Sequence, residues 1–457
     1  MTVFSRFILS GILALAVSGS MLPTARAQFV QQGGKLVGTG AVGGAEQGRS
    51  VALSADGNTA IVGGPEDNWG TGNNAGPGAA WVFTRSGGVW TQQGNKLVGT
   101  GAAGGAEQGW SVALSGDGNT AIVGSSGDGA WVFTRSGNVW TQQGDGLVGT
   151  GNGPGYSVAL SGDGNTALLG GWNDYLSNGG AAWVFTRSGN VWTQQGDKLV
   201  GTGAVGNFCS WDSVALSGDG NTALLGWGCD SVLAGAAWVF TRSGNVWAQQ
   251  GDKLVGTGAV GSRAQQGQSV ALSEDGNTAI IGGPGDSNGV GAAWVFTRSG
   301  NVWTQQGNKL VGTGGYVALS ADGNTAIIGG PGDSNVMGAA WVYTRSGGVW
   351  TQQGGKLVGT GAVGQALQGG SVALSGDANT AIMGGEDDNG DAGAAWVFVS
   401  ASTTPAEPTI TAVENGASFA EGTISPGSWV AIFGTGLAPA GGQRSRSLSV
   451  WPSGASW

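Results

Sequence analysis

A single sequence unit recurs seven times along the chain, and this repetition constrains the fold more than any other feature. The core of the unit is Val-Ala-Leu-Ser, which begins at Val51, Val112, Val158, Val214, Val270, Val317 and Val372. Successive cores lie between 46 residues (Val112 to Val158) and 61 residues (Val51 to Val112) apart. Such a period is typical of one propeller blade and exceeds that of most helical repeats.

Each unit divides into four short runs at clusters of Gly, Asn and Asp. In the fullest copy the runs are residues 269–273, 278–282, 292–298 and 302–311. They are rich in β-branched and aromatic residues, and no window after the N-terminus shows a sustained helical period. The sequence therefore predicts an all-β, seven-bladed β-propeller built from four-stranded antiparallel blades.

The two ends of the array predict how the ring closes. The seventh unit stops at Ser400 and lacks the fourth run, whereas residues 28–37, QFVQQGGKLV, have the fourth-run signature and stand alone ahead of the first unit. We expect this N-terminal strand to complete the last blade, because a closed ring removes long exposed sheet edges.

Tryptophans recur in register within the third run, and we expect them in the core because buried aromatic side chains dominate protein interiors. The alternative is a role in stacking on a ligand. These tryptophans are Trp81, Trp131, Trp183, Trp238, Trp294, Trp341 and Trp396.

The N-terminus has the pattern of a secretory signal peptide. Arg6 precedes an apolar stretch, and Ala25-Arg26-Ala27 is a small-x-small cleavage site. We expect residues 1–27 to be removed after Ala27 and the mature protein to be secreted or associated with the cell surface. No later segment has the length of apolar sequence that a membrane span requires.

The net charge of the chain indicates which classes of partner it can bind. The chain has 18 Lys and Arg residues against 28 Asp and Glu, a net charge of −10. A protein so acidic repels phosphate, so nucleic acid is not an expected partner. We expect an extracellular glycan or protein instead, and the sequence makes no prediction of oligomeric state.

Cys209 and Cys229 are the only two cysteines. If Asp219 lies at the centre of the hairpin between the first two strands of the fourth unit, the two cysteines face each other at its open end. We expect a disulfide in an exported protein, which would stabilise the fold by about 2–4 kcal/mol. Two free buried thiols are the alternative.

The repeat resembles the FG-GAP repeat of the integrin α-subunit propeller and its bacterial relatives. The residues that carry the likeness are Gly267-Gln-Ser-Val-Ala-Leu-Ser273, Ile281-Gly-Gly-Pro-Gly-Asp286 and Gly291-Ala-Ala-Trp-Val-Phe296, and it extends over residues 28–400. The resemblance implies a seven-bladed propeller with a binding or adhesion role. In that family a longer loop of alternating acidic residues binds calcium, whereas the turn here is only Ser273-Glu-Asp-Gly-Asn-Thr278. We therefore predict no cofactor and no metal, because so short a turn does not support a calcium cage of six to eight oxygens.

A second module follows the propeller. Residues 401–408 are rich in Pro, Ser and Thr and are predicted to form a linker. Residues 409–457 resemble the start of an uncharacterised Ig-like C-terminal domain of secreted bacterial proteins, through Val413-Glu-Asn-Gly-Ala-Ser-Phe419 and Ile432-Phe-Gly-Thr-Gly-Leu437. Only the first strands of that domain are present and residues 441–457 lose the resemblance, so we expect a truncated or frameshifted segment. So short a sequence with few apolar residues does not bury an adequate core alone.

Two sets of aspartates recur in every unit. The first, Asp56, Asp117, Asp163, Asp219, Asp275, Asp322 and Asp377, precedes Asn-Thr in a tight turn and is explained by turn chemistry. The second set follows the second strand, where loops vary in length and content, and variable loops on a rigid scaffold are where binding usually occurs. With nearby tryptophans it forms the predicted ligand-binding set: Asp67, Asp128, Asp174, Asp230, Asp286, Asp333, Asp388, Trp69, Trp110, Trp172, Trp211 and Trp227. The alternative is that each of these aspartates only caps its loop.

The chain has no histidine, which removes Ser-His-Asp triads, Cys-His pairs and the usual zinc hydrolase motifs. We therefore predict no catalytic residue and no enzymatic activity, and expect a secreted binding or adhesion protein that recognises a glycan or protein through its loop face. One alternative is an extracellular carbohydrate-active enzyme that uses a carboxylate pair, such as Asp387 with Asp391 or Glu66 with Asp67. Another is a purely structural surface repeat protein.

Overall fold

The computed structural model of the chain describes residues 28–69, 76–102, 105–149, 154–174, 179–206, 212–312, 314–401, 409–415 and 430–435. The side chains of residues 172–174, 179 and 212, and of the two C-terminal segments, are outside the description. Residues 28–401 form one compact unit. The predicted signal peptide and linker lie outside the described residues.

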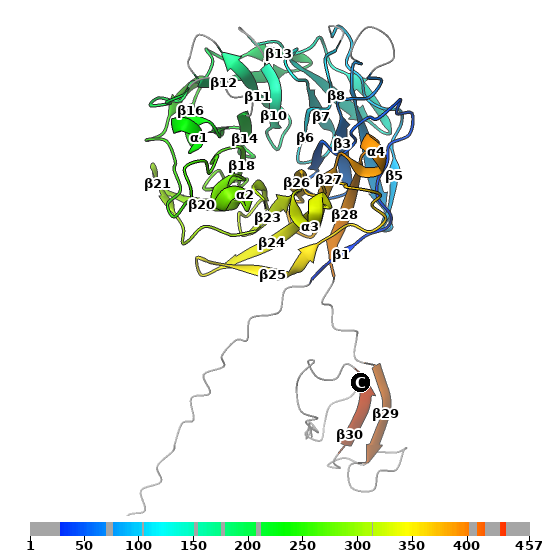
Figure 1. Cartoon of the computed structure of the whole chain (residues 1–457). Helices are drawn as coiled ribbons and strands as arrows, with labels where there is room; N and C mark the ends of the chain where they lie inside the picture. The colour runs from blue at the N-terminus through cyan, green and yellow to red at the C-terminus, as the bar shows by residue number, and fades with distance from the viewer. Residues whose placement is uncertain are drawn as a thin grey trace, which may run out of the picture. The chain divides into compact units, whose positions relative to one another are not determined.

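Seven four-stranded antiparallel sheets surround a common axis, which confirms the predicted propeller (Figure 1). In six blades the four strands follow one another in sequence from the axis outward. The innermost strands are β2 (Ser50–Leu53), β6 (Ser111–Leu114), β10 (Pro154–Leu160), β14 (Asp212–Leu216), β18 (Ser269–Leu272), β22 (Tyr316–Leu319) and β26 (Ser371–Leu374). The second strands are β3 (Thr59–Gly64), β7 (Thr120–Gly124), β11 (Thr166–Asp174), β15 (Thr222–Trp227), β19 (Thr278–Gly283), β23 (Thr325–Gly330) and β27 (Thr380–Gly385).

The outer half of each blade carries the Ala-Trp-Val-Phe and Trp-Thr-Gln runs. The third strands are β4 (Ala79–Ser86), β8 (Ala130–Ser136), β12 (Gly179–Ser188), β16 (Ala236–Ser243), β20 (Ala292–Ser299), β24 (Ala339–Ser346) and β28 (Ala394–Ser400). The outermost strands are β5 (Val89–Gln92), β9 (Val139–Gln142), β13 (Val191–Gln194), β17 (Val246–Gln249), β21 (Val302–Gln305), β25 (Val349–Leu357) and, from the N-terminus, β1 (Phe29–Gln31).

Strand β1 closes the ring as predicted. It pairs antiparallel with β28, with Phe29 opposite Ser400 and Gln31 opposite Phe398. The pairing continues past the strand, since the Leu36 backbone N–H donates to the Ala395 carbonyl at 2.7 Å. The last blade is therefore made from both ends of the propeller sequence, and its outer edge is covered.

The repeated aspartate turns join the first and second strands, on what we call the turn face. In the first blade the Ser54 hydroxyl and the Asn58 backbone N–H both donate to Asp56 Oδ1, at 2.5 and 2.9 Å. All seven blades repeat these two bonds. Burial raises the pKa of Asp56, but these bonds and the charge of Arg85 together lower it below its ordinary value. The prediction that turn chemistry explains this set is confirmed.

One backbone hydrogen bond per blade links these turns into a closed circuit around the axis. Each turn donates from the same position to the carbonyl of the next blade, over distances of 2.8–3.0 Å. The circuit runs through Ala55, Gly116, Gly162, Gly218, Glu274, Ala321 and Gly376 and returns to Ala55. Because Gly376 donates to Ala55, the first and last blades are joined at the axis as well as at the rim.

The recurrent tryptophans are core residues, as predicted. Six of the seven are at most 3% exposed, and Trp341 is half-buried. The Trp131 indole packs against the linker ahead of its own blade, where a Cβ on Gly99 would lie 2.1 Å from its ring. Its Nε1 donates to the Thr100 carbonyl at 2.9 Å. The glycines of the Val-Gly-Thr-Gly phrase therefore make room for the indole.

A second contact, which we call the Arg-Trp-Gln contact, joins neighbouring blades near the rim. In blade 1, Arg85 lies 5.3 Å from the Trp90 ring centroid, and both side chains donate to Gln32 Oε1 of blade 7. The same contact joins every successive pair of blades up to blades 5 and 6. Between blades 6 and 7 the Arg and Trp positions hold Ser400 and Phe29. We call this the closing junction.

Four single turns follow second strands on the opposite side, the loop face: α1 (Asp230–Leu233), α2 (Asp286–Gly289), α3 (Asp333–Val336) and α4 (Asp388–Asp391). Their middle residues have left-handed dihedrals, for example φ +54° at Ser287 and +61° at Asn288. Outside the propeller, β29 (Thr409–Asn415) and β30 (Val430–Thr435) pair antiparallel. Within the described residues, no helix has both the length and the apolar character needed to cross a membrane.

Candidate functional site

The blades are nearly identical, but one position on the loop face differs in almost every copy. It directly precedes the Ser-Val-Ala-Leu phrase at the start of each innermost strand. The residues there are Arg49, Trp110, Tyr156, Asp212, Gln268, Gly315 and Gly370, and in blade 6 the following serine is also replaced, by Tyr316. Fold alone does not require this variation, because the strands that follow are uniform.

These variable residues surround a cavity of about 280 Å³ at the propeller axis. Arg49, Trp110, Tyr156, Gln268 and Tyr316 line it, together with the serines and valines that begin the inner strands. We call it the axial cavity. Its volume is near the lower end of the range for small-molecule sites, which is about 300–1,000 Å³.

The serines of the phrase support the wall of this cavity. Ser111 Oγ accepts the Val158 backbone N–H of the next blade at 3.0 Å, and Ser157 Oγ accepts that of Val214 at the same distance. Ser213 and Ser269 repeat the contact. The serines thus satisfy backbone groups on the free edge of the neighbouring strand, and the variable side chains lie on a fixed frame.

Arg49 is held at the centre of a polar and aromatic cluster. Its Nη1 donates to both carboxylate oxygens of Glu386 at 2.9 Å, and its Cζ lies 4.3 Å from the Trp110 ring centroid. The Trp110 and Tyr156 rings are 5.1 Å apart and tilted by 45°. Burial lowers the pKa of Arg49, but Glu386 and the two facing tyrosines, Tyr156 and Tyr316, raise it overall.

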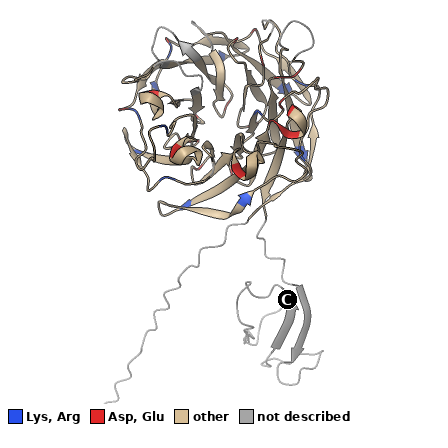
Figure 2. Cartoon of the chain, in the orientation of Figure 1, with Lys and Arg blue, Asp and Glu red and all other residues tan. Residues whose placement is uncertain are grey.

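Carboxylates gather beside this cluster, from blades 7, 1 and 2. Burial, followed by the charges of Glu66 and Glu386, raises the pKa of Glu46 to about 7, although Arg49 opposes the shift. The pKa of Asp387 is raised too, by burial and then by Glu386 and Asp391. Glu46 is therefore largely protonated below neutral pH and can donate a proton. Figure 2 shows acidic residues on the α1–α4 turns.

The second aspartate set lies mostly beneath the loop face. Asp67, Asp230, Asp286 and Asp388 are at most 1% exposed. Each pairs with a lysine of the outer segment, in the order Lys96, Lys253, Lys309 and Lys35. The other oxygen of each accepts a backbone N–H from the linker ahead of its own blade, at 2.7–2.9 Å. With both oxygens engaged, these four have the structural role that was the alternative, and we propose no ligand contact for them.

The rest of that set differs. Asp333 pairs with Lys356 and is more exposed, at 13% of its side chain. Asp128 is exposed, and its blade has Gly146 where the others have the lysine. The side chain of Asp174 lies outside the described residues. Of the Glu66 with Asp67 carboxylate pair, Asp67 is buried and paired with Lys96.

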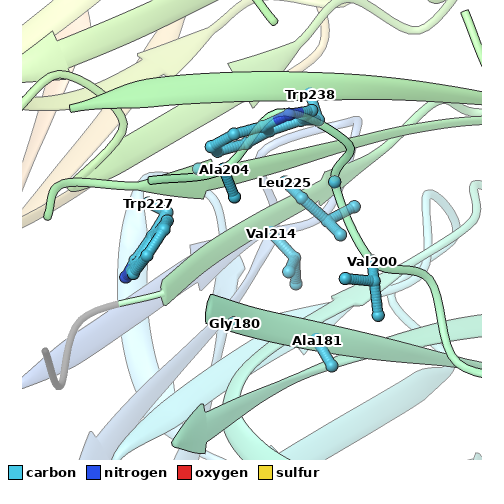
Figure 3. A pocket seen from close by; sticks show the side chains of 10 residues that line it. Gly180, Ala181, Val200, Ala204, Val214, Leu225, Trp227 and Trp238 are labelled. Carbon is cyan, nitrogen blue, oxygen red and sulfur yellow. The ribbon is translucent and has the colours of Figure 1, made fainter. Parts of the chain in front are cut away.

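The predicted tryptophans separate into three groups. Trp110 lines the axial cavity, Trp69 is 42% exposed, and Trp227 is buried, with its ring 6.3 Å from that of Trp238. Figure 3 shows Trp227 and Trp238 at a small apolar cavity between blades 3 and 4. This cavity has about 20 Å³, room for one water molecule at most. Trp211 and the side chain of Trp172 lie outside the described residues.

Cys229 is 6% exposed, whereas Cys209 is outside the described residues, so the disulfide remains a prediction. Within the described part of the chain, no three Cys, Asp or Glu side chains are grouped to hold a metal ion.

Reasoning from the sequence missed Arg49, Tyr156, Gln268 and Tyr316 as site residues. The signal was available, because they occupy or adjoin the variable position before an otherwise invariant phrase. A search for deviations from the repeat at one register position would have found them.

No protein-family profile matches the chain, and no curated protein matches it. Among solved structures, it is similar to a protein of Bacteroides uniformis provisionally named a 6-phosphogluconolactonase, with 15% identity and a TM-score of 0.47. The match covers 68% of this chain and 85% of that one. The FG-GAP likeness therefore remains a resemblance of motifs.

The prediction that the protein is not an enzyme is corrected. The finding that stands against it is that the similar solved structure is named for a catalytic activity. At this identity the similarity assigns neither a reaction nor a substrate.

Proposed function

We propose that the axial cavity binds a saccharide, in a secreted protein that recognises glycans through the loop face of its propeller. One observation carries this proposal: a repeat whose strands are nearly identical varies where its innermost strands begin, at positions that line the cavity. Random drift would spread substitutions over all exposed positions, whereas a recognition site concentrates them where side chains meet a ligand.

The side chains at the cavity suit a sugar. Trp110, Tyr156 and Tyr316 offer aromatic faces for the apolar C–H surface of a pyranose ring. Arg49 and Gln268 offer hydrogen-bond donors, and Glu386, which does not line the cavity, holds Arg49 in place. Few polar groups in a partly apolar cavity are the usual composition of a small-molecule site.

A glycan array with the full-length secreted protein tests the proposal. We expect saturable binding that Trp110→Ala weakens by about 10-fold or more, because an aromatic stacking surface and its packing with Tyr156 are removed. Trp69→Ala is the matched control, since it removes an exposed tryptophan that does not line the cavity. Binding that Trp69→Ala weakens and Trp110→Ala leaves intact would place recognition elsewhere. An array with no hits, and capture of a protein partner that Trp110→Ala abolishes, would replace the saccharide by a protein.

Glycoside cleavage is a second candidate function, and the pKa of Glu46 favours it. A carboxyl group with a pKa of about 7 suits a general acid, and Glu386, in its ion pair with Arg49, is a second carboxylate of the same cluster. We expect release of a chromogenic aglycone to fall as the pH rises above 7 and to be lost in Glu46→Gln. Glu274→Gln, on the turn face, is the control. Turnover that Glu46→Gln leaves unchanged would remove this candidate.

A further inference from the structure

A second cavity, of about 330 Å³, lies on the loop face at blade 5. The linker into that blade contributes Gly261, Ser262, Arg263 and Gln265, the loop after β19 contributes Gly285 and Asn288, and Leu233 of α1 completes the wall. We call it the blade 5 cavity. It shares no lining residue with the axial cavity.

A one-residue insertion places Arg263 at this cavity. In blades 1, 2, 5 and 7, a glutamine side chain bonds back to a glycine backbone at the start of the linker. The glycine and glutamine are nine residues apart in blades 1, 2 and 7 and ten apart in blade 5, between Gly256 and Gln266. Because both ends are fixed by this bond, the extra residue bulges outward.

Gly285 accommodates the bulge. A Cβ at Gly285 would lie 2.0 Å from the Arg263 carbonyl oxygen, so no other residue fits without a shift of the backbone. The same register position, directly before the buried aspartate, holds Glu66 in blade 1 and Asp387 in blade 7. Blade 5 therefore has a glycine where blades 1 and 7 have an acidic side chain, and the inserted arginine lies beside it.

The guanidinium of Arg263 has no hydrogen bond or ion pair within the described part of the chain. The other seven arginines of the described propeller each bond to a carboxylate or amide, as Arg49 does to Glu386 and Arg298 to Asn277. No carboxylate lines the blade 5 cavity. In a chain with a net charge of −10, this is a concave surface with a cation and no acid.

We propose that the blade 5 cavity binds an anionic group, a carboxylate or a sulfate, of an extracellular ligand. A guanidinium presents paired N–H donors that match either group in two parallel hydrogen bonds. The Ser262 hydroxyl and the amides of Gln265 and Asn288 supply neutral donors along the same wall. Leu233 provides an apolar surface for the body of the ligand. The inference does not depend on saccharide binding at the axial cavity.

Calorimetric titration of the full-length protein with sodium sulfate, glucuronate and glucose tests the inference. We expect sulfate or glucuronate to bind in the wild type, with glucose at least 10-fold weaker, and the stronger of the two anions identifies the group. Arg263→Gln should abolish this preference, and Arg263→Lys should retain part of it, since a lysine keeps the charge without the paired donors.

Asn301→Asp is the matched control. It changes the net charge by the same amount as Arg263→Gln, on the turn face, and keeps the Oδ1 that accepts from Gln250 at 3.0 Å. Binding that both variants weaken equally would reflect overall charge and overturn the inference. Equal affinity for glucuronate and glucose together with no sulfate binding, or anion binding that Arg263→Gln leaves unchanged, would overturn it too. Trp110→Ala should leave anion binding intact, which separates this site from the axial cavity.

Discussion

Removal of one partner from a buried Asp-Lys pair is the most informative perturbation of this fold. In blade 5 the Asp286 side chain is fully buried, and its oxygens accept from Lys309, from the Ser287 hydroxyl at 2.9 Å and from the Val260 backbone N–H at 2.7 Å. The Lys309 side chain is 15% exposed. The two partners therefore differ in their access to water, and their removal should differ in cost.

Lys309→Met leaves a fully buried carboxylate without its cation, so we expect a loss of about 3–5 kcal/mol. Asp286→Ala leaves an ammonium that reaches water and removes the acceptor of the Val260 backbone N–H, so we expect about 2–3 kcal/mol. In blade 6 the Asp333 and Lys356 side chains are 13% and 38% exposed, so Asp333→Ala should cost only about 1 kcal/mol. Blade 6 is thus an internal control with the same residues.

Thermal unfolding by calorimetry measures these losses. For the 28–401 unit, an unfolding entropy of about 2.1 cal/mol/K per residue converts 1 kcal/mol into a shift of about 1.3 °C. Lys309→Met should therefore lower the Tm by about 4–7 °C. The double variant should cost less than the sum of the single changes by about 1–3 kcal/mol, because each single change leaves an unpaired group. Additive losses, or equal losses in blades 5 and 6, would refute burial as the cause.

The pair of Asp286 and Lys309 also makes the stability of the fold depend on pH. Burial raises the pKa of Asp286, but the hydrogen bonds from Lys309, the Val260 N–H and Ser287 lower it below its ordinary value of 3.8. A depressed pKa in the folded state gives stability that is present above pH of about 4 and is lost as the pH falls through the folded value. Lys309→Met should remove most of this acid dependence from blade 5.

Two further predictions concern the closing junction and Glu46. The double variant Phe29→Trp with Ser400→Arg restores the missing Arg-Trp-Gln contact and should raise the Tm by about 1 °C or more. Gln353 would then accept from an arginine and a tryptophan, as the equivalent glutamines of the other blades do. A lower Tm would show that the junction is already complete. Because the folded pKa of Glu46 is raised to about 7, its contribution to stability falls as the pH rises from 4.5 to 7. Glu46→Gln should therefore raise the Tm at pH 7.5 and leave it nearly unchanged at pH 4.5, and a uniform shift at both would contradict the reasoning.

The fold was predictable because its information is local and repeated seven times. Ser54, Asp56 and Asn58 specify a turn by their own hydrogen bonds, and Trp81 and Phe83 mark β4 as a buried strand. The ring closure was predictable from the displaced fourth run at Gln28, because an edge strand without a partner is unfavourable. The turn and strand signals depend on neighbours in the sequence, whereas the ring closure was visible in the order of the runs.

The candidate site was less predictable because it depends on contacts between blades. Arg49 and Glu386 are separated by 337 positions in the chain and meet only when the ring is closed. Asp67 was expected to reach a ligand, but its environment depends on Lys96, whose ammonium reaches back beneath the loop. The recurrence of both residues was visible in the sequence, whereas their contact was not. Blade 2 contains the hint, since Gly146 replaces the lysine in the blade where Asp128 is exposed.

The seven copies act as controls for one another, and this identifies where function departs from fold. Residues that recur, such as Asp286 with Lys309 or Arg298 with Trp303, make contacts that stabilise the fold of the blades. Residues that occur once, such as Trp110 or Arg263, are not required for the fold, because neighbouring blades fold with other residues in their place. Both single-copy groups lie at cavities on the loop face. On the turn face the hydrogen-bonded circuit engages the backbone of all seven turns, which agrees with our proposal that a ligand binds at the loop face.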